Sequence, residues 1–264
     1  GNNDIISVSC GSSALEGKSH LHVTSLATPT KVTGSGRMGQ GIDPNAVLKE
    51  AGMATSVRAG SFSINGKFIS VDPETESLND ILAKINDPVT GIPGVSATYN
   101  ASTDKVVLSS EADIQLGSGA DTGNFLSAVW LEGQTGREIT GTVSLGVVQE
   151  KVSLDSARFK NPLEPTGAGA FKINGVEIIF DTAQDTLDDI IERINNSHAG
   201  VRAAYDYLED RITLTAQYTG SKIIQMEDAS GNFLFAAGLL GAEQKLGANA
   251  VYTIDEINGG NPLT

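Results

Sequence analysis

Apolar residues alternate with polar ones in two matching stretches of the chain, and an Asn-Gly pair interrupts each stretch. Asn-Gly supplies the two positive-φ positions of a type I′ turn, so the pattern predicts β-hairpins around Asn65-Gly66 and Asn174-Gly175. The apolar positions are Phe62, Ile64, Phe68, Ile69 and Val71 in the first hairpin, and Phe171, Ile173, Val176 and Ile178 in the second.

After each hairpin the apolar residues recur at i, i+3, i+4 and i+7, which predicts a short amphipathic helix. Ser77 and Thr186 stand at the expected N-caps, and Asp80 and Asp189 follow three residues later. This spacing resembles a capping box, in which each residue bonds the backbone N–H of the other. The apolar stripes are Leu78, Ile81, Leu82 and Ile85, then Leu187, Ile190, Ile191 and Ile194.

Two more alternating strands are predicted after each helix. Their apolar residues are Val95, Ala97, Tyr99, Val106 and Leu108 in the first copy, and Val201, Ala203, Tyr205, Ile212 and Leu214 in the second. Each copy is therefore a ββ-α-ββ unit in which a short helix packs on a small antiparallel sheet. The predicted fold class is α+β and β-rich, with two small head domains of this kind.

The two copies form an internal repeat. Gly60 aligns with Gly169, an offset of 109 residues, and the first copy carries three extra residues between Pro88 and Pro93. The copies match again at their ends, where Gly123-Asn124-Phe125-Leu126 aligns with Gly231-Asn232-Phe233-Leu234. So many matches in the same order indicate a duplicated unit.

The repeat suggests domain boundaries. We expect one head domain at residues 1–149, containing the copy at 60–131, and a second at 150–264, containing the copy at 169–240. An alternative stays open, in which one domain is inserted in the other and N-terminal strands at 4–32 join a C-terminal strand at 250–256. The glycine-rich stretch from Thr33 to Ala59 is expected to be a long, mobile loop.

Composition narrows the classes of function. The chain has 264 residues, of which 39% are hydrophobic and 19% charged, and its net charge of −14 is spread along its length. A diffuse negative surface repels nucleic acid and anionic membranes, so neither is an expected partner. No apolar run reaches the ~18 residues of a membrane span, so no membrane insertion is expected. The one cysteine, Cys10, lies in an alternating stretch and is expected to be a strand residue.

Three short motifs that could carry chemistry lack their required context. Gly34-Ser35-Gly36-Arg37-Met38-Gly39 fits the dinucleotide pattern G-x-G-x-x-G, but Pro44 interrupts the helix that should follow. Glu16-Gly17-Lys18-Ser19 resembles the end of a phosphate-binding P-loop without its first glycine. His20 and His22 share one face of a predicted strand, but no third metal ligand stands near them.

The acidic pairs Asp188-Asp189 and Glu209-Asp210 lie at a predicted helix start and in a predicted turn, where acidic residues are favoured for structural reasons. We therefore expect no catalytic residue, no metal site and no cofactor, and the chain is predicted not to be an enzyme. Four asparagines that recur in both copies are expected to serve turns and helix ends: Asn65, Asn86, Asn174 and Asn195.

The repeated segment F-x-I-N-G, followed by L-x-D-I, I-N, G-V-x-A-x-Y and D-K/R-V/I-x-L, resembles the flagellin hook IN motif. Tandem copies of this motif occur in the bacterial flagellar filament capping protein family, also called the hook-associated protein 2 family. The flanks from Ser9 to Leu26 and from Ala250 to Asp255 are similar to that family as well. The chain begins at Gly1 without an initiator methionine and lacks the family's terminal helical regions, so we expect a fragment that carries the head domains.

The resemblance implies a structural component of the bacterial flagellum, secreted and located outside the cell at the filament tip. It implies a distal cap ring that promotes flagellin assembly, and therefore other copies of the chain and flagellin as partners. Two alternatives stay open. One is a tip-exposed adhesin module that binds host or surface glycans or proteins, and the other is a different flagellar axial protein that carries the same motif.

Overall fold

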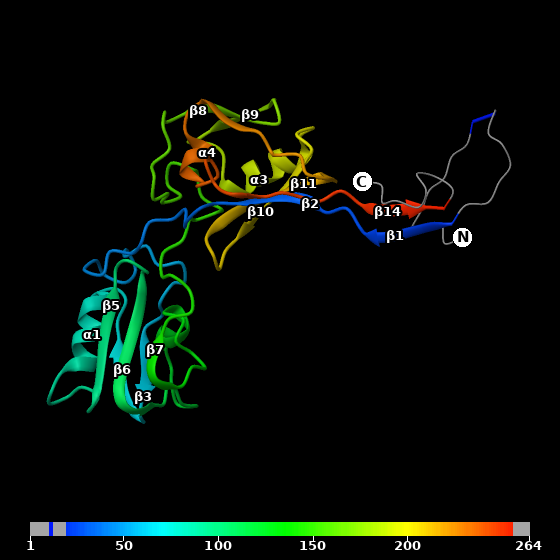
Figure 1. Ribbon diagram of the computed structural model, residues 1–264. Helices are drawn as coiled ribbons and strands as arrows, with labels where there is room; N and C mark the ends of the chain where they lie inside the picture. Colours follow the sequence, from blue (N-terminus) through cyan, green and yellow to red (C-terminus); the bar gives the residue numbers. More distant parts are fainter. Residues whose placement is uncertain (1–10, 13–19, 256–264) are drawn as a thin grey trace.

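The computed structural model describes residues 11–12 and 20–255. The predicted strand at Cys10 and the Glu16–Ser19 motif lie outside the described residues. Within them the predicted fold class is confirmed, because short helices pack on several small antiparallel sheets (Figure 1). None of the helices in this part of the chain has the length and apolar character needed to span a membrane.

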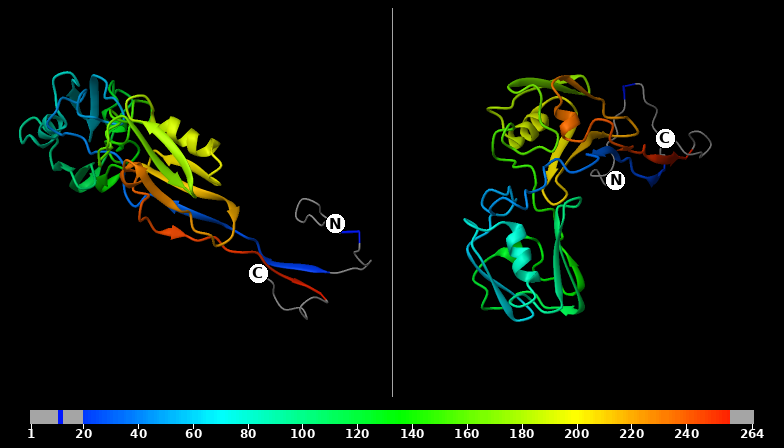
Figure 2. Two further views of the ribbon diagram at one scale, coloured as in Figure 1. Left: turned by 90° about the horizontal axis from the view of Figure 1, so that it is seen from above. Right: turned by 90° about the vertical axis from the view of Figure 1, so that its left-hand side faces the viewer.

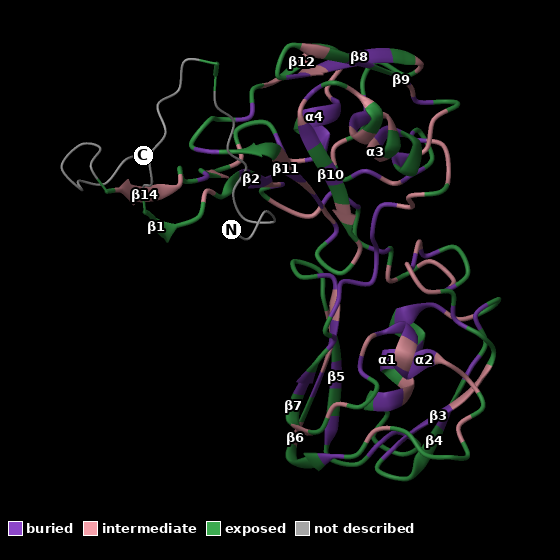
Figure 3. Cartoon of the chain, turned by 90° about the vertical axis from the view of Figure 1, so that its right-hand side faces the viewer, coloured by how far each residue is buried: buried purple, intermediate pink, exposed green. Residues whose placement is uncertain are grey.

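Two separate hydrophobic cores organise the described chain. The first core contains buried residues from Ile42 to Leu145, and we call this part the first unit. The second core contains buried residues from Val148 to Leu239 together with Val32 and Met38, and we call this part the second unit. Figure 3 shows the buried segments gathered in these two groups.

The first unit contains five strands and two helices: β3 (Gly60–Ile64), β4 (Lys67–Val71), α1 (Leu78–Asn86), β5 (Val95–Asn100), β6 (Lys105–Ile114), α2 (Phe125–Ala128) and β7 (Gly136–Thr140). The second unit contains β8 (Ala168–Ile173), β9 (Val176–Asp181), α3 (Leu187–Asn196), β10 (Val201–Asp206), β11 (Arg211–Thr219), β12 (Met226–Ser230), α4 (Phe233–Ala236) and β13 (Gln244–Lys245), together with β2 (Pro29–Thr33).

Each unit has two sheets where the sequence predicted one. The hairpin β3–β4 is a sheet of its own, and β5, β6 and β7 form another; in the second unit the orders are β12-β8-β9 and β10-β11-β2-β13. The helix explains the difference, because α1 contacts both β4 and β5, and α3 contacts both β9 and β10. The helix of each unit therefore packs against both of its sheets.

Both predicted capping boxes are present. The Asp80 backbone N–H donates to the Ser77 hydroxyl at 3.2 Å, and the Ser77 N–H donates to the Asp80 carboxylate at 2.9 Å. Thr186 and Asp189 make the same pair of bonds. Bonds from the Ser77 backbone and hydroxyl hold the pKa of Asp80 below its usual value.

The recurring asparagines bond to backbone groups. Asn86 accepts from the Ala97 N–H and donates to the Ala97 carbonyl, and Asn195 does the same with Ala203. These bonds fasten the end of each helix to the following strand. Asn65 and Asn174 occupy the positive-φ positions of the hairpin turns, at 51° and 50°.

The stretch from Thr33 to Ala59 forms a loop after β2, as predicted, but it is packed, so the expectation that it is mobile is wrong. Met38, Ile42, Leu48 and Ala51 are buried in it. Its backbone bonds have counterparts in the second unit: Asp43 to Ala51 matches Gln149 to Ala157, and Leu48 to Glu76 matches Leu154 to Asp185. The structural repeat therefore begins earlier in the chain than the matching letters indicated.

A two-stranded ribbon extends from the second unit, on the side away from the first (Figures 1 and 2). It consists of β1 (Leu21–Ser25) and β14 (Val251–Ile254), which pair antiparallel. His20 lies 3.3 Å from Asp255 at its far end, and both side chains are exposed. Residues 20 and 255 therefore lie beside each other at the end of the ribbon.

Candidate functional site

The two units are joined by two chain segments that lie side by side, and we call these the crossing segments. The first, residues 39–42, leads into the first unit, and the second, residues 146–148, leads back to the second unit. Glycines let them approach closely: a Cβ added at Gly39 would lie 2.5 Å from the Val148 nitrogen, and one added at Gly146 would meet the Gln40 carbonyl oxygen.

Two buried carboxylates hold both crossing segments. Asp104 lies in the β5–β6 turn of the first unit, and Asp210 lies at the equivalent place in the β10–β11 turn of the second. Both are 1% exposed, and their φ values are 54° and 52°. Asp and Asn tolerate this left-handed region better than most residues. The turn therefore points each carboxylate inward, toward the backbone of the crossing segments.

The hydrogen bonds of the two carboxylates correspond. Asp104 accepts from the Ile42 N–H at 3.1 Å and the Gly146 N–H at 2.7 Å. Asp210 accepts from the Gly39 N–H at 2.7 Å and the Val148 N–H at 3.2 Å. Each carboxylate thus bonds one residue of each crossing segment, one at the end nearer the first unit and the other at the end nearer the second.

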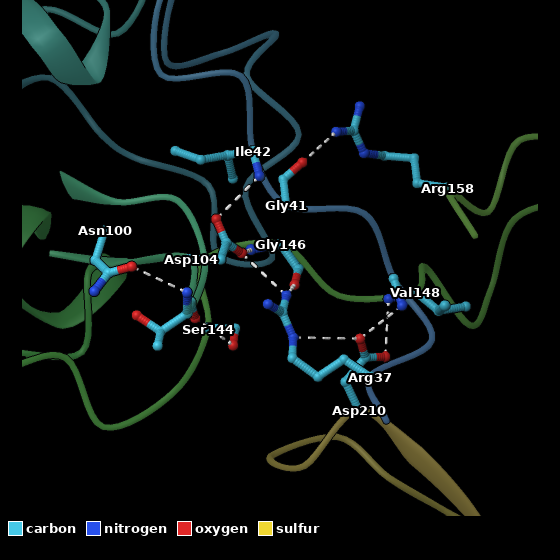
Figure 4. Close-up of polar contacts among 12 residues, drawn as sticks. Arg37, Gly41, Ile42, Asn100, Asp104, Ser144, Gly146, Val148, Arg158 and Asp210 are labelled. Carbon is cyan, nitrogen blue, oxygen red and sulfur yellow. Dashed lines mark hydrogen bonds and ion pairs between the residues drawn. The ribbon is translucent and has the colours of Figure 1, made fainter. Parts of the chain in front are cut away.

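A tyrosine and a shared arginine complete this group. The Tyr99 hydroxyl donates to Asp104 and the Tyr205 hydroxyl to Asp210, both at 2.7 Å. Arg37 lies between the carboxylates, with Nη2 3.0 Å from Asp104 and Nε 3.9 Å from Asp210 (Figure 4). We call these five side chains the junction clamp. The clamp fastens the two units through one cation and two symmetric sets of bonds.

Burial shifts the pKa values of Asp210 and of the two clamp tyrosines. It raises the pKa of Asp210, and the bonds from Tyr205, Gly39 and Val148 oppose that rise. Burial and the neighbouring carboxylates also raise the pKa values of Tyr99 and Tyr205 far above their usual range. Both phenols therefore stay protonated and serve as hydrogen-bond donors.

An aromatic contact adds to the junction. Trp130 of the first unit and Tyr207 of the β10–β11 turn lie with their ring centroids 6.2 Å apart. Trp130 is the only tryptophan in the chain. Its fluorescence can therefore report on the junction without interference from another indole.

Replacing Gly39 with alanine is expected to lower the free energy of unfolding by about 1–3 kcal/mol, because the added methyl group would collide with the Val147–Val148 backbone. Urea unfolding followed by circular dichroism and Trp130 fluorescence would measure the loss. Gly36→Ala is the matched control, since nothing lies within 4 Å of a Cβ there. Equal stabilities of the two variants would contradict the close packing of the crossing segments.

The structure gives the sequence motifs other roles. Arg37 and Gly39 of the G-x-G-x-x-G motif belong to the junction. Asp210 is buried in the clamp, whereas its neighbour Glu209 and the helix residue Asp188 are exposed. Among the residues that the structure describes, no three His, Cys, Asp or Glu side chains are grouped so as to hold a metal ion. The arrangement suits mechanical connection of two units.

Comparison with known proteins gives the chain its relatives. Residues 170–217, from β8 into β11, match the family described as the flagellin hook IN motif. Flagellar hook-associated protein 2 of Thermotoga maritima is 30% identical to the chain over 252 residues, which cover 90% of this chain and 40% of that protein. The chain is a relative of flagellar hook-associated protein 2. The resemblance identified in the sequence is thereby confirmed.

The chain spans two-fifths of the length of the Thermotoga hook-associated protein 2. Two solved structures are also similar: the D2-D3 domains of the flagellar cap protein FliD from Serratia marcescens, at 17% identity, and the cap protein FliD from Helicobacter pylori, at 14%. The first alignment covers 83% of this chain and 96% of that one with a TM-score of 0.25, and the second covers 92% and 93% with a TM-score of 0.21. These TM-scores are too low to establish a common arrangement of domains.

Proposed function

We propose that this chain is part of a structural protein of the bacterial flagellum that forms the distal filament cap and promotes flagellin assembly at the tip. The observation that carries the proposal is the 30% identity to a hook-associated protein 2, which extends over 90% of the chain. The flagellin hook IN motif at residues 170–217 supports it, and the copy at residues 60–131 repeats its Asn-Gly turn and the apolar pattern of its helix.

On this proposal the chain works by assembly and not by catalysis. Its partners are other copies of the same protein in a cap ring, and flagellin. Its place is outside the cell, at the end of the filament. The adhesin alternative gains no support from the relatives, whose names describe flagellar proteins.

We also propose that the first unit is a domain inserted in the second. Two observations support this division in place of boundaries at 149 and 150. Val32 and Met38 lie in the second core, although they precede the first unit. Strand β2 pairs with β11 and β13, so residues on both sides of the first unit share one sheet.

A deletion experiment tests the cap function. We would delete the whole gene in the parent organism, image the cells by electron microscopy and assay the medium for flagellin. Hooks without filaments, with unpolymerised flagellin in the medium, are the expected result. Complementation with the whole gene should restore filaments, and complementation without the codons for residues 20–255 should not. Normal filaments in the deletion strain would refute the cap function.

A further inference from the structure

The second strand of each repeat hairpin is an edge strand. β9 ends the sheet β12-β8-β9, and β4 pairs only with β3 among the described strands. One side of an edge strand presents backbone N–H and C=O groups that another strand can bond. Side chains exposed on these strands are apolar in part, since Ile179 is 64% and Phe68 is 49% exposed.

An ion pair occupies this edge in the second unit. Arg193 of α3 bonds both oxygens of Asp185, each at 2.8 Å. The same arginine donates to the Ile179 carbonyl, and the Asp181 N–H donates to Asp185 at 2.8 Å. The pair therefore bonds one outward C=O and one outward N–H of β9, as the backbone of a neighbouring strand would.

The first unit has the same arrangement with different side chains. Lys84 pairs with Glu76 and donates to the Ser70 carbonyl at 2.8 Å. The Asp72 N–H donates to Glu76 at 2.8 Å. Each of these positions lies 109 residues before its counterpart in the second unit. The two copies thus keep the bonds, although lysine replaces arginine and glutamate replaces aspartate.

In the second unit a groove lies beside this edge. A groove of about 480 Å³ opens between β9 and α3, with Glu177, Ile179, Glu192 and Arg193 in its lining. Two β9 edges from two molecules could pair antiparallel about a twofold axis, because such an interface is self-complementary. That pairing would bring one Ile179 beside the other and cover their exposed surface.

We propose that the pairs Asp185–Arg193 and Glu76–Lys84 are edge plugs that keep a strand from a second copy of this chain from joining β9 or β4. Each plug takes the backbone bonding sites that the added strand needs and places a charged group in its path. This inference is independent of the proposed cap function.

The test removes the cation of each plug from the 264-residue chain. Arg193→Met and Lys84→Met keep a long apolar stem and remove the donor and the charge. The repeat supplies the controls, because Arg193→Lys and Lys84→Arg install the cation that the other unit uses. Sedimentation velocity over a range of concentrations measures association, and circular dichroism reports on folding.

We expect each methionine variant to associate at a concentration at least about tenfold lower than the parent, since the freed edge can pair. The Lys/Arg exchanges should sediment like the parent. Methionine variants that keep the native spectrum and sediment like the parent would overturn the proposal. Loss of the native spectrum in both would also overturn it, because the pairs would then be holding the hairpins themselves together.

Discussion

Asp210→Ala is expected to lower the free energy of unfolding by about 3–5 kcal/mol. The change leaves the Gly39 N–H, the Val148 N–H and the Tyr205 hydroxyl without their acceptor in a buried place, and each such loss costs about 1–3 kcal/mol before relaxation. Alanine also tolerates φ of 52° poorly. Urea unfolding followed by circular dichroism and Trp130 fluorescence would measure the effect.

Glu209→Ala is the matched control, because it removes the same charge from the adjacent, exposed position. We expect that change to fall within about 0.5 kcal/mol of the parent. A loss at Asp210 no larger than at Glu209 would show that the clamp does not stabilise the fold.

The contribution of Asp210 to the free energy of unfolding is expected to fall as the pH rises. Because burial raises its pKa in the folded protein, the native state binds this proton more readily than the unfolded chain does. Its contribution to the free energy of unfolding is therefore greatest below the unfolded pKa of about 3.9 and declines as the pH rises through the higher folded value. Asp210→Asn should remove this part of the pH dependence.

Phe233→Ala is expected to cost about 3–5 kcal/mol, as for other large-to-small changes of a buried aromatic residue. Phe233 is fully buried and stacks on Phe171 with ring centroids 4.8 Å apart. The rings of Phe180 and Phe159 lie beside it as well, with centroids 5.7 and 6.5 Å from that of Phe233. Calorimetry and urea unfolding would measure the loss.

Phe235 provides the control for this prediction, since it lies on the same short helix and is 53% exposed. Phe235→Ala should change the stability by less than about 0.5 kcal/mol. If both variants lose equal stability, the aromatic stack is not the source of the effect. Trp130 contacts Tyr207 at the junction, so its fluorescence would also show whether the junction stays intact when the second core is weakened.

The local elements could be predicted because their signals are local. Asn65-Gly66 requires positive φ, and Ser77 with Asp80 satisfies the first turn of a helix, so neighbouring residues decide both structures. The division into separate sheets could not be predicted in this way. An alternating pattern tells which face of a strand is apolar, but it does not tell which strand lies beside it. The pairing of β2 with β11 joins residues about 180 positions apart, and nothing in either strand specifies the other.

The sequence does not reveal the junction clamp, for the same reason. Its local pattern marks Asp210 as an ordinary turn residue and Arg37 as part of a loop, because the bonds of both residues join distant parts of the chain. A signal was nevertheless present. Tyr99 precedes Asp104 by five residues, and Tyr205 precedes Asp210 by the same spacing. A tyrosine and a carboxylate that recur together in duplicated turns indicate a shared bond, although the sequence does not reveal what else they hold.

The paired crossing segments make the first unit an exchangeable module. The chain enters and leaves that unit through these adjacent segments, and the two cores share no buried residue among those described. A domain that is interrupted between two adjacent segments keeps its own strand pairing whatever folded domain is inserted there. The condition is that the two ends of the inserted domain lie close together. Evolution can therefore enlarge, replace or remove the first unit while the second unit and its ribbon continue to fold as before.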